Sequence, residues 1–114
     1  MTRAVSGFVL FPSDAPTAVA PTLLVEARDV SLADAPSVVL ASVLVANAAI
    51  FPAARIGFSI NVPVFEKSRT VALRCHVDMD ADGAVSAGDF LSTAFLGVHH
   101  REVVQGLLLP VKRV

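Results

Sequence analysis

Short runs in which apolar and polar residues alternate, separated by proline, glycine, aspartate and asparagine, dominate this chain. The first run covers residues 3–11 and places Val5, Gly7, Val9 and Phe11 on one face. Further runs occupy residues 22–31, 37–46, 55–64, 69–79, 90–98 and 102–114. Alternation with a period of two is typical of strands that bury one face. The pattern therefore predicts about seven strands.

The alternation also predicts which side chains point inward. In the second, fourth and fifth runs the expected inward residues are Leu23, Val25, Ala27, Ile56, Phe58, Ile60, Val62, Val71, Leu73, Cys75 and Val77. In the fifth run Ala72, Arg74, His76 and Asp78 are expected to face outward. These faces predict one shared apolar core.

The third and last runs differ from this simple pattern. Residues 37–46 are apolar on both faces, which favours a central strand, and their valines and the flanking Pro36 and Pro52 argue against a helix. Pro110 in the last run favours a strand at a sheet edge. Seven short strands with frequent turns predict an all-β fold, a two-layer antiparallel β-sandwich that forms a single domain over residues 1–114.

Composition limits the classes of partner. The formal net charge of the 114 residues is −1, so no charge excess points to nucleic acid. No apolar segment reaches the length of a membrane helix, so we expect no direct membrane insertion. Hydrophobic residues make up 54% of the chain, an excess that predicts contact with a protein partner or with a second copy in a homodimer.

The cellular compartment depends on whether the chain is complete. The single cysteine, Cys75, excludes an internal disulfide framework. The first eleven residues resemble neither a signal peptide nor a lipidation motif. We expect a cytoplasmic protein if the chain is complete as written, and a periplasmic or envelope protein if a leader was removed.

Residues 78–89, DMDADGAVSAGD, carry the strongest chemical signal. Their spacing matches a calcium loop, in which oxygen ligands stand at positions 1, 3, 5, 7, 9 and 12 and a glycine with φ > 0 makes the sharp turn at position 6. Gly83 occupies that turn position, and Val85 is placed to anchor the loop to the core. The predicted ligands are Asp78, Asp80, Asp82, the carbonyl of Ala84, Ser86 and Asp89.

Two features separate this loop from an EF-hand. A strand pattern and not a helix precedes it, so the sequence predicts an EF-hand-like loop in a strand connection with a structural role. Asp89 replaces the usual bidentate glutamate, which weakens calcium binding or admits magnesium. The alternative is a polar hairpin turn, since Asp-Gly also favours such turns.

Catalysis finds little support in the sequence. Cys75 and His76 are neighbours, but adjacent strand residues face apart, and Cys75 belongs to the apolar face. The same rule would separate His99 from His100 if they lay in a strand, so exposed loop histidines are the favoured interpretation. A small hydrolase or ligand-binding enzyme that uses Cys75, His76 or His99 remains the alternative to a protein without enzymatic activity.

Three stretches resemble a known family. VSGFVLFP, VEARDVSLADAPSVVLASVLV and IFPAARIGFSINVP are similar to the YbaY/YscW-type lipoproteins, which include type III secretion pilotins. The resemblance covers about residues 5–63, and DVSLADAP at residues 29–36 is its most specific part. It implies a small β-sandwich, often tethered to a membrane by a lipid, that binds or chaperones another envelope protein without catalysis. Together with the acidic loop, it predicts a noncatalytic interaction protein with a structural calcium site.

Overall fold

The computed structural model describes residues 1–32, 34–93, 96–100 and 104–114, and among these residues it contains strands and no helix. The strands are β1 (Thr2–Leu10), β2 (Ala18–Asp29), β3 (Val38–Ile50), β4 (Arg55–Pro63), β5 (Val71–Asp78), β6 (Phe90–Ser92) and β7 (Val104–Arg113). The all-β prediction and the number of strands are confirmed. Within the described ranges, no helix is long and apolar enough to span a membrane.

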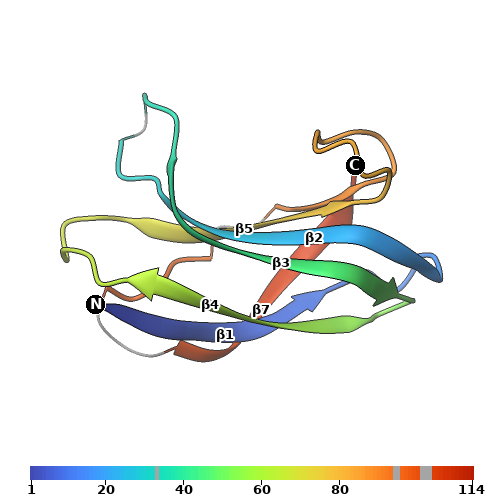
Figure 1. Cartoon of the computed structure of the whole chain (residues 1–114), viewed down its shortest axis with the longest axis horizontal. Helices are drawn as coiled ribbons and strands as arrows, with labels where there is room; N and C mark the ends of the chain where they lie inside the picture. The colour runs from blue at the N-terminus through green and yellow to red at the C-terminus, as the bar shows by residue number, and fades with distance from the viewer. Residues whose placement is uncertain (33, 94–95, 101–103) are drawn as a thin grey trace.

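The strands form one curved sheet in the order β3-β2-β5-β6-β7-β1-β4. The sheet bends so strongly that β1 and β4 lie opposite β2, β3 and β5, while β7 crosses obliquely between these layers (Figure 1). All pairings are antiparallel except that of β1 with β7, which is parallel. The fold is therefore nearly a barrel, and the prediction of two purely antiparallel sheets was correct only in its general class.

The turn between β3 and β4 brings the two ends of the sheet together. Ala53 N–H donates to the carbonyl of Pro12, and Phe11 N–H donates to the carbonyl of Ala54, at 3.0 and 2.9 Å. These bonds fix the turn to the connection between β1 and β2. The barrel is closed at this end by a loop contact, since the described backbone bonds include no ladder between β3 and β4.

The position predicted for β3 was wrong. β3 is a terminal strand that pairs with β2 alone among the described strands, and Val38, Val39 and Leu44 are 61%, 45% and 57% exposed. An apolar character on both faces is usual for a central strand, and here it occurs at an edge. The helical alternative for this segment is excluded, because the strand runs over Val38–Ile50.

The edge position predicted for the last strand was also wrong. β7 lies between β6 and β1. Its residues up to and including Pro110 pair with β1, and its residues from Val111 onward pair with β6. Pro110 is tolerated because it stands where one ladder ends and the next begins, so it has a described strand partner on one side only.

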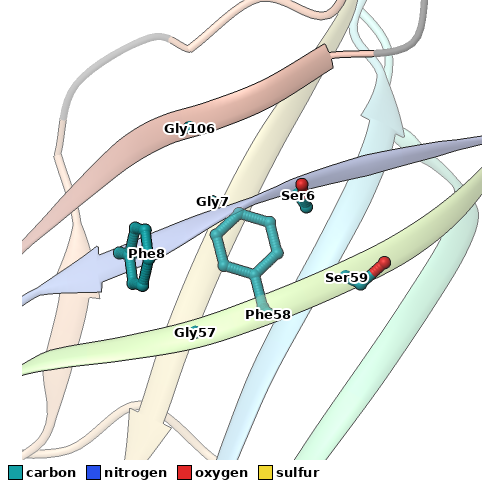
Figure 2. A pocket seen from close by; sticks show the side chains of 7 residues that line it. All are labelled: Ser6, Gly7, Phe8, Gly57, Phe58, Ser59 and Gly106. Atoms are coloured by element: carbon teal, nitrogen blue, oxygen red, sulfur yellow. The ribbon is translucent and has the colours of Figure 1, made fainter.

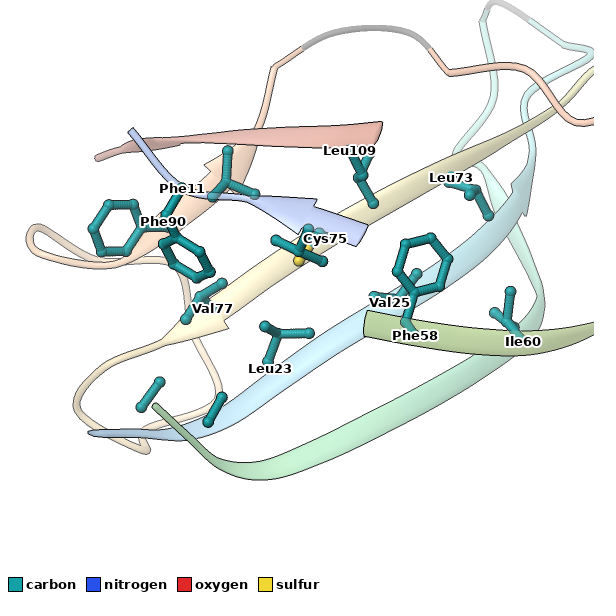
Figure 3. Packing of buried hydrophobic residues seen from close by; sticks show 14 of the residues in the cluster. Phe11, Leu23, Val25, Phe58, Ile60, Leu73, Cys75, Val77, Phe90 and Leu109 are labelled. Atoms are coloured by element: carbon teal, nitrogen blue, oxygen red, sulfur yellow. The ribbon is translucent and has the colours of Figure 1, made fainter. Parts of the chain in front are cut away.

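The core agrees closely with the inward faces expected from the alternation. Fully buried members contributed by five strands are Val5, Val9, Leu23, Val25, Ala27, Val62, Cys75, Val77 and Leu109. Figure 3 shows how the side chains of Leu23, Val25, Cys75, Val77 and Leu109 converge between the two layers of the sheet. Phe11 and Phe90 meet edge to face with ring centroids 5.2 Å apart, a geometry that adds about 0.5–1.5 kcal/mol to the burial of their area.

Strand boundaries were predicted less well. β2 starts at Ala18, four residues before the expected run, because Ala18 to Ala20 pair with the end of β3. Within the expected strand at residues 90–98, the structure has a strand at Phe90–Ser92. Residues 94–95 and 102–103 of the expected strands, and residue 33 of the DVSLADAP segment, lie outside the described residues.

Candidate metal loop and other candidate sites

The acidic segment connects β5 to β6. Asp78 is the last residue of β5, and Asp89 directly precedes β6. The backbone has positive φ at Ala81, Gly83 and Gly88, with values of 58°, 77° and 96°. Gly83 thus has the left-handed conformation that its predicted turn position requires. The backbone turns back on itself and returns Asp89 to the end of β5.

This fold brings four of the predicted ligand residues together. Carboxylate oxygens of Asp78, Asp80, Asp82 and Asp89 lie within 4.8 Å of one another. The Ser86 hydroxyl donates to Asp80 Oδ2 at 2.9 Å, so it belongs to the same cluster. Four carboxylates this close repel one another unless protons or a cation compensate their charge, and hard divalent cations prefer such oxygen ligands.

Backbone amides orient the two buried carboxylates of the cluster. Gly83 N–H donates to Asp78 Oδ2 at 2.7 Å, and Met79 N–H donates to Asp89 Oδ1 at 2.9 Å. Ser86 N–H donates to Asp89 Oδ2 at 3.1 Å. The remaining oxygen, Asp78 Oδ1, is buried and has no hydrogen-bond partner. A buried acceptor without a partner is unfavourable by about 1–3 kcal/mol, so a ligand bound to this oxygen would stabilise the loop.

One expectation for the loop, the anchoring role of Val85, was wrong, and another, the Ala84 carbonyl as a ligand, is not tested by the structure. Val85 is 42% exposed, so it does not anchor the loop to the core. Ala84 N–H donates to Asp82 Oδ1 at 3.0 Å, which places this residue beside the cluster. The role of its carbonyl as a ligand stays a prediction.

His76 is a member of the site that the sequence did not reveal. It was expected on an outward, solvated face, yet it is only 8% exposed, and Ala72 and Asp78 on the same face are also buried. Its Nε2 lies 2.9 Å from Asp89 Oδ2. Burial acts to raise the pKa of Asp89, but the hydrogen bonds from His76, Met79 and Ser86 outweigh burial and lower it. One signal was available: residues 76 and 78 are two apart in a strand and share a face.

The residues of the enzymatic alternative do not converge. Cys75 points into the core, as Figure 3 shows, whereas His76 lies on the opposite face of β5. His99 follows Val98, whose N–H bonds the carbonyl of Val71 at the beginning of β5, far along the strand from His76. The rings of His99 and His100 lie 4.5 Å apart in a loop, so the opposite orientations expected for a strand do not apply.

Burial makes the thiol of Cys75 unreactive. It raises the pKa of Cys75 to about 12, and thiolate is the reactive form. We expect iodoacetamide at pH 8 to leave Cys75 unmodified in the folded protein and to alkylate it fully in denaturant, as measured by intact mass. Rapid alkylation of the folded chain would contradict this placement.

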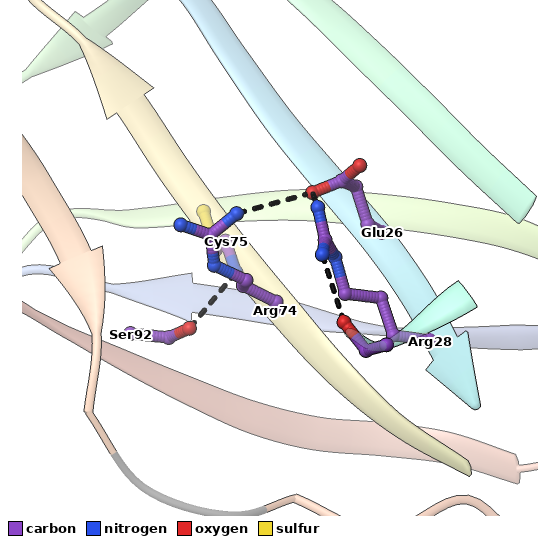
Figure 4. A network of polar contacts seen from close by, with 6 residues as sticks. Glu26, Arg28, Arg74, Cys75 and Ser92 are labelled. Atoms are coloured by element: carbon purple, nitrogen blue, oxygen red, sulfur yellow. Dashed lines mark hydrogen bonds and ion pairs between the residues drawn. The ribbon is translucent and has the colours of Figure 1, made fainter. Parts of the chain in front are cut away.

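Polar side chains on the outer face of β2 and β5 form a second cluster. Glu26 Oε1 lies 3.0 Å from Arg28 Nη2 and 3.4 Å from Arg74 Nη1, and Arg28 also donates to Ser37 Oγ at 2.9 Å. Figure 4 shows Glu26 between the two arginines. This arrangement is an ion-pair network in which two arginines compensate the charge of a buried glutamate.

The most specific part of the family resemblance has a structural explanation. Asp29 Oδ1 accepts hydrogen bonds from the backbone and hydroxyl of Ser31, and Asp29 Oδ2 lies 3.1 Å from Arg69 Nη1. Ser31 Oγ in turn accepts a bond from Thr70 N–H at 2.9 Å. The first residues of DVSLADAP therefore fix the turn after β2 to the start of β5.

A shallow groove of about 360 Å³ crosses the outer face of β4, β1 and β7. Its lining residues are Ser6, Gly7, Phe8, Gly57, Phe58, Ser59 and Gly106. Figure 2 shows their side chains, with the ring of Phe8 standing beside Gly57. None of these seven residues carries a titratable group, so the groove offers no acid or base for catalysis.

Comparisons with known proteins identify the fold. A scan against protein-family models found no match, and a search of curated proteins found none either. The chain is similar to the solved structure of an alternative pilotin from the type II secretion system of Vibrio cholerae, with 20% identity and a TM-score of 0.70 over 100% of both chains. At this identity the likeness shows a shared pilotin-like fold. Membership of the YbaY/YscW-type family stays a prediction.

Proposed function

We propose that this chain is a noncatalytic interaction protein of the cell envelope, which binds an extended segment of a protein partner along the free edge of β3. The observation that carries the proposal is the long, uncharged and unpaired edge of this strand. Its fold supports the same class of function, because it is shared with a pilotin of a secretion system.

The edge of β3 has the chemistry of a strand acceptor. β3 extends over 13 residues, and the sequence has no charged residue between Asp34 and Arg55. Its backbone donors and acceptors on the side away from β2 have no strand partner among the described residues. Charged residues and prolines usually protect such edges from pairing, and β3 contains neither. An added strand would satisfy these groups, and the exposed Val38, Val39 and Leu44 would contact its side chains.

The envelope location and the family rest on likeness. The pilotin-like fold and the resemblance of residues 5–63 to the YbaY/YscW-type lipoproteins both favour a component associated with secretion on the periplasmic side. The absence of catalysis is supported by the buried thiol of Cys75 and by the groove without titratable groups.

The homodimer predicted from composition takes a new form in this proposal. The last strand, which was expected at an edge, is internal and offers no edge to a second copy. Self-association would therefore pair β3 of one copy with β3 of another, in competition with the partner. The same experiment distinguishes the two.

A photoreactive amino acid at position 39 should cross-link the partner in the native envelope, while the same amino acid at position 108 should not. Leu108 is the matched control for Val39. The two residues are 43% and 45% exposed, but Val39 lies on a terminal strand and Leu108 on an internal one. Mass spectrometry should identify one envelope protein. A product of twice the chain mass would instead identify a second copy.

A charge on the edge should abolish the cross-link. Leu44→Lys places a charge on the edge strand, the device by which natural edge strands discourage pairing, and we expect it to reduce the yield from position 39 at least fivefold. Leu108→Lys should leave the yield unchanged. Equal yields from positions 39 and 108, or no effect of Leu44→Lys, would refute the edge as the binding surface.

A second candidate function is a structural calcium site in the β5–β6 loop, with magnesium as a weaker occupant. The proposed ligands are Asp78, Asp80, Asp82, the carbonyl of Ala84, Ser86 and Asp89. Support comes from the four converging carboxylates and from the unpartnered, buried Asp78 Oδ1. Titration calorimetry of the chelator-treated protein with calcium tests it directly, and the absence of binding heat together with an unchanged melting temperature would leave only a polar turn.

A further inference from the structure

We infer that His76, Asp78 and Asp89 form a site for a first-row transition-metal ion such as Zn²⁺ or Mn²⁺. This inference goes beyond the proposed calcium loop, because it adds a nitrogen ligand and a different class of ion. It shares two carboxylates with that loop, so the two ions would exclude each other.

Two paired strands hold the three side chains in place. His76 and Asp78 project from the same face of β5, and Asp89 directly precedes β6. β5 is fixed against β6 by two cross-strand pairs, His76 opposite Leu91 and Val77 opposite Phe90. The three residues are 8%, 4% and 1% exposed. His76 and Asp78 lie on a paired strand, where side chains are positioned more rigidly than on a loop, and Asp89 is adjacent to the next strand.

The distances allow a common ion after a small adjustment. One ligand atom from each of the three residues lies within 4.8 Å of the others, and His76 Nε2 and Asp89 Oδ2 are 2.9 Å apart. Two ligands bound at about 2.1 Å from one ion are at most about 4.2 Å apart. The widest separation must therefore close by less than about 1 Å.

Two observations point to an ion at this position. Asp78 Oδ1 is buried without a hydrogen-bond partner, although it belongs to a group of potential ligands. The other carboxylate oxygens accept backbone N–H groups of Met79, Gly83 and Ser86. Such outer contacts orient ligands around metal ions in proteins. The arrangement leaves Asp78 Oδ1 as the open acceptor.

The imidazole determines the class of ion. Calcium and magnesium bind oxygen ligands, whereas an imidazole nitrogen together with carboxylates suits zinc and its first-row neighbours. Binding replaces the hydrogen bond between His76 Nε2 and Asp89 Oδ2 by a bond from each atom to the ion. The neutral imidazole then carries its proton on Nδ1 and presents the Nε2 lone pair. Water completes the coordination.

The test compares the binding of two ions to three forms of the protein. Chelator-treated wild type, His76→Gln and Asp80→Asn are titrated with Zn²⁺ and with Ca²⁺ by calorimetry, and Co²⁺ reports coordination through its visible absorption bands. Glutamine can still donate a hydrogen bond to Asp89 but is a poor zinc ligand. Asp80 belongs only to the group of four carboxylates, so Asp80→Asn removes a calcium ligand and no ligand of the histidine site.

We expect opposite effects from the two substitutions. His76→Gln should weaken Zn²⁺ binding at least 10- to 100-fold, since the loss of an outer contact of a metal site alone has that effect, and should abolish the Co²⁺ bands while Ca²⁺ affinity changes less than threefold. Asp80→Asn should weaken Ca²⁺ binding and leave Zn²⁺ affinity unchanged. Circular dichroism checks that each variant folds. If His76→Gln is unfolded, His76→Asn takes its place, because Asp78 is shared with the calcium loop and its loss would not separate the two proposals.

The outcomes separate this inference from the calcium proposal. Zn²⁺ binding that depends on His76, without any Ca²⁺ binding, would support the inference and remove the calcium loop. Ca²⁺ binding with no Zn²⁺ uptake would do the reverse. Zn²⁺ binding with unchanged affinity in His76→Gln would place the ion on other residues and overturn the inference.

Discussion

Replacing Gly7 with alanine is expected to lower the free energy of unfolding by about 3 kcal/mol or more, because the added methyl group has no space. A Cβ at this position would lie 2.2 Å from the carbonyl oxygen of Leu107 and 2.8 Å from its carbonyl carbon. Both are backbone atoms of β7, which cannot rotate away as a flexible side chain would. The parallel pairing of β1 with β7 would have to separate, and this pairing joins the two halves of the curved sheet.

Gly57 provides the matched control on the neighbouring strand. A Cβ there would meet the ring of Phe8 at 3.8 Å, an ordinary contact, so Gly57→Ala should change the unfolding free energy by less than about 0.5 kcal/mol. Urea unfolding followed by circular dichroism measures both variants. Equal stabilities of the Gly7 and Gly57 variants would show that β1 and β7 do not approach as closely as described.

Gly7 also shows which part of the fold is readable from sequence. Alternation placed it correctly on the inward face between Val5 and Val9, because face is a local property with a period of two. The same alternation identified the core of β2, β4 and β5. It could not reveal that β7, about a hundred residues later, lies parallel to β1, because strand pairing depends on contacts across the whole chain.

β3 illustrates the same limit at the level of strand order. An apolar strand was expected at the centre of the sheet, where both faces are covered. In the structure it is terminal, and only part of its apolar surface packs against the core. Hydrophobicity reports that a surface prefers contact, but does not distinguish contact within the chain from contact with another protein. The mismatch at β3 is the basis of the proposed binding edge.

The spacing of the aspartates was sufficient to locate the acidic loop in the sequence, but it did not reveal which residues surround the loop. Ligand spacing is local, so the convergence of Asp78, Asp80, Asp82 and Asp89 could be anticipated. The burial of His76 could not, because it follows from the return of the loop to Asp89 across 13 residues. A histidine two residues before the first aspartate of a strand-borne loop is the pattern to look for in similar chains.

Calcium at a hundred times its dissociation constant is expected to stabilise the fold by about 2.7 kcal/mol if only the native state binds it, and to raise the melting temperature by about 10 °C. The gain arises because the doubly charged ion reduces the repulsion among four neighbouring carboxylates and satisfies Asp78 Oδ1, which is buried and without a partner. Excess chelator should reverse it. Differential scanning calorimetry in calcium and in chelator measures the shift.

Removing charge from the exposed part of the loop should abolish this gain without disturbing the strands. The double variant Asp80→Asn and Asp82→Asn keeps the shape of two exposed side chains, and each asparagine can still accept the hydrogen bond made by Ser86 or Ala84. Glu66→Gln is the control, because it also replaces a carboxylate by an amide, but in the connection between β4 and β5, at the end of β5 opposite to the loop. This variant should retain the full calcium-dependent shift in melting temperature. In chelator the double variant should melt at or above the wild-type temperature, since it relieves repulsion among the carboxylates. A calcium-dependent shift that survives in the double variant would place the stabilising ion outside the loop, and the segment DMDADGAVSAGD would then act only as the turn that returns Asp89 to His76.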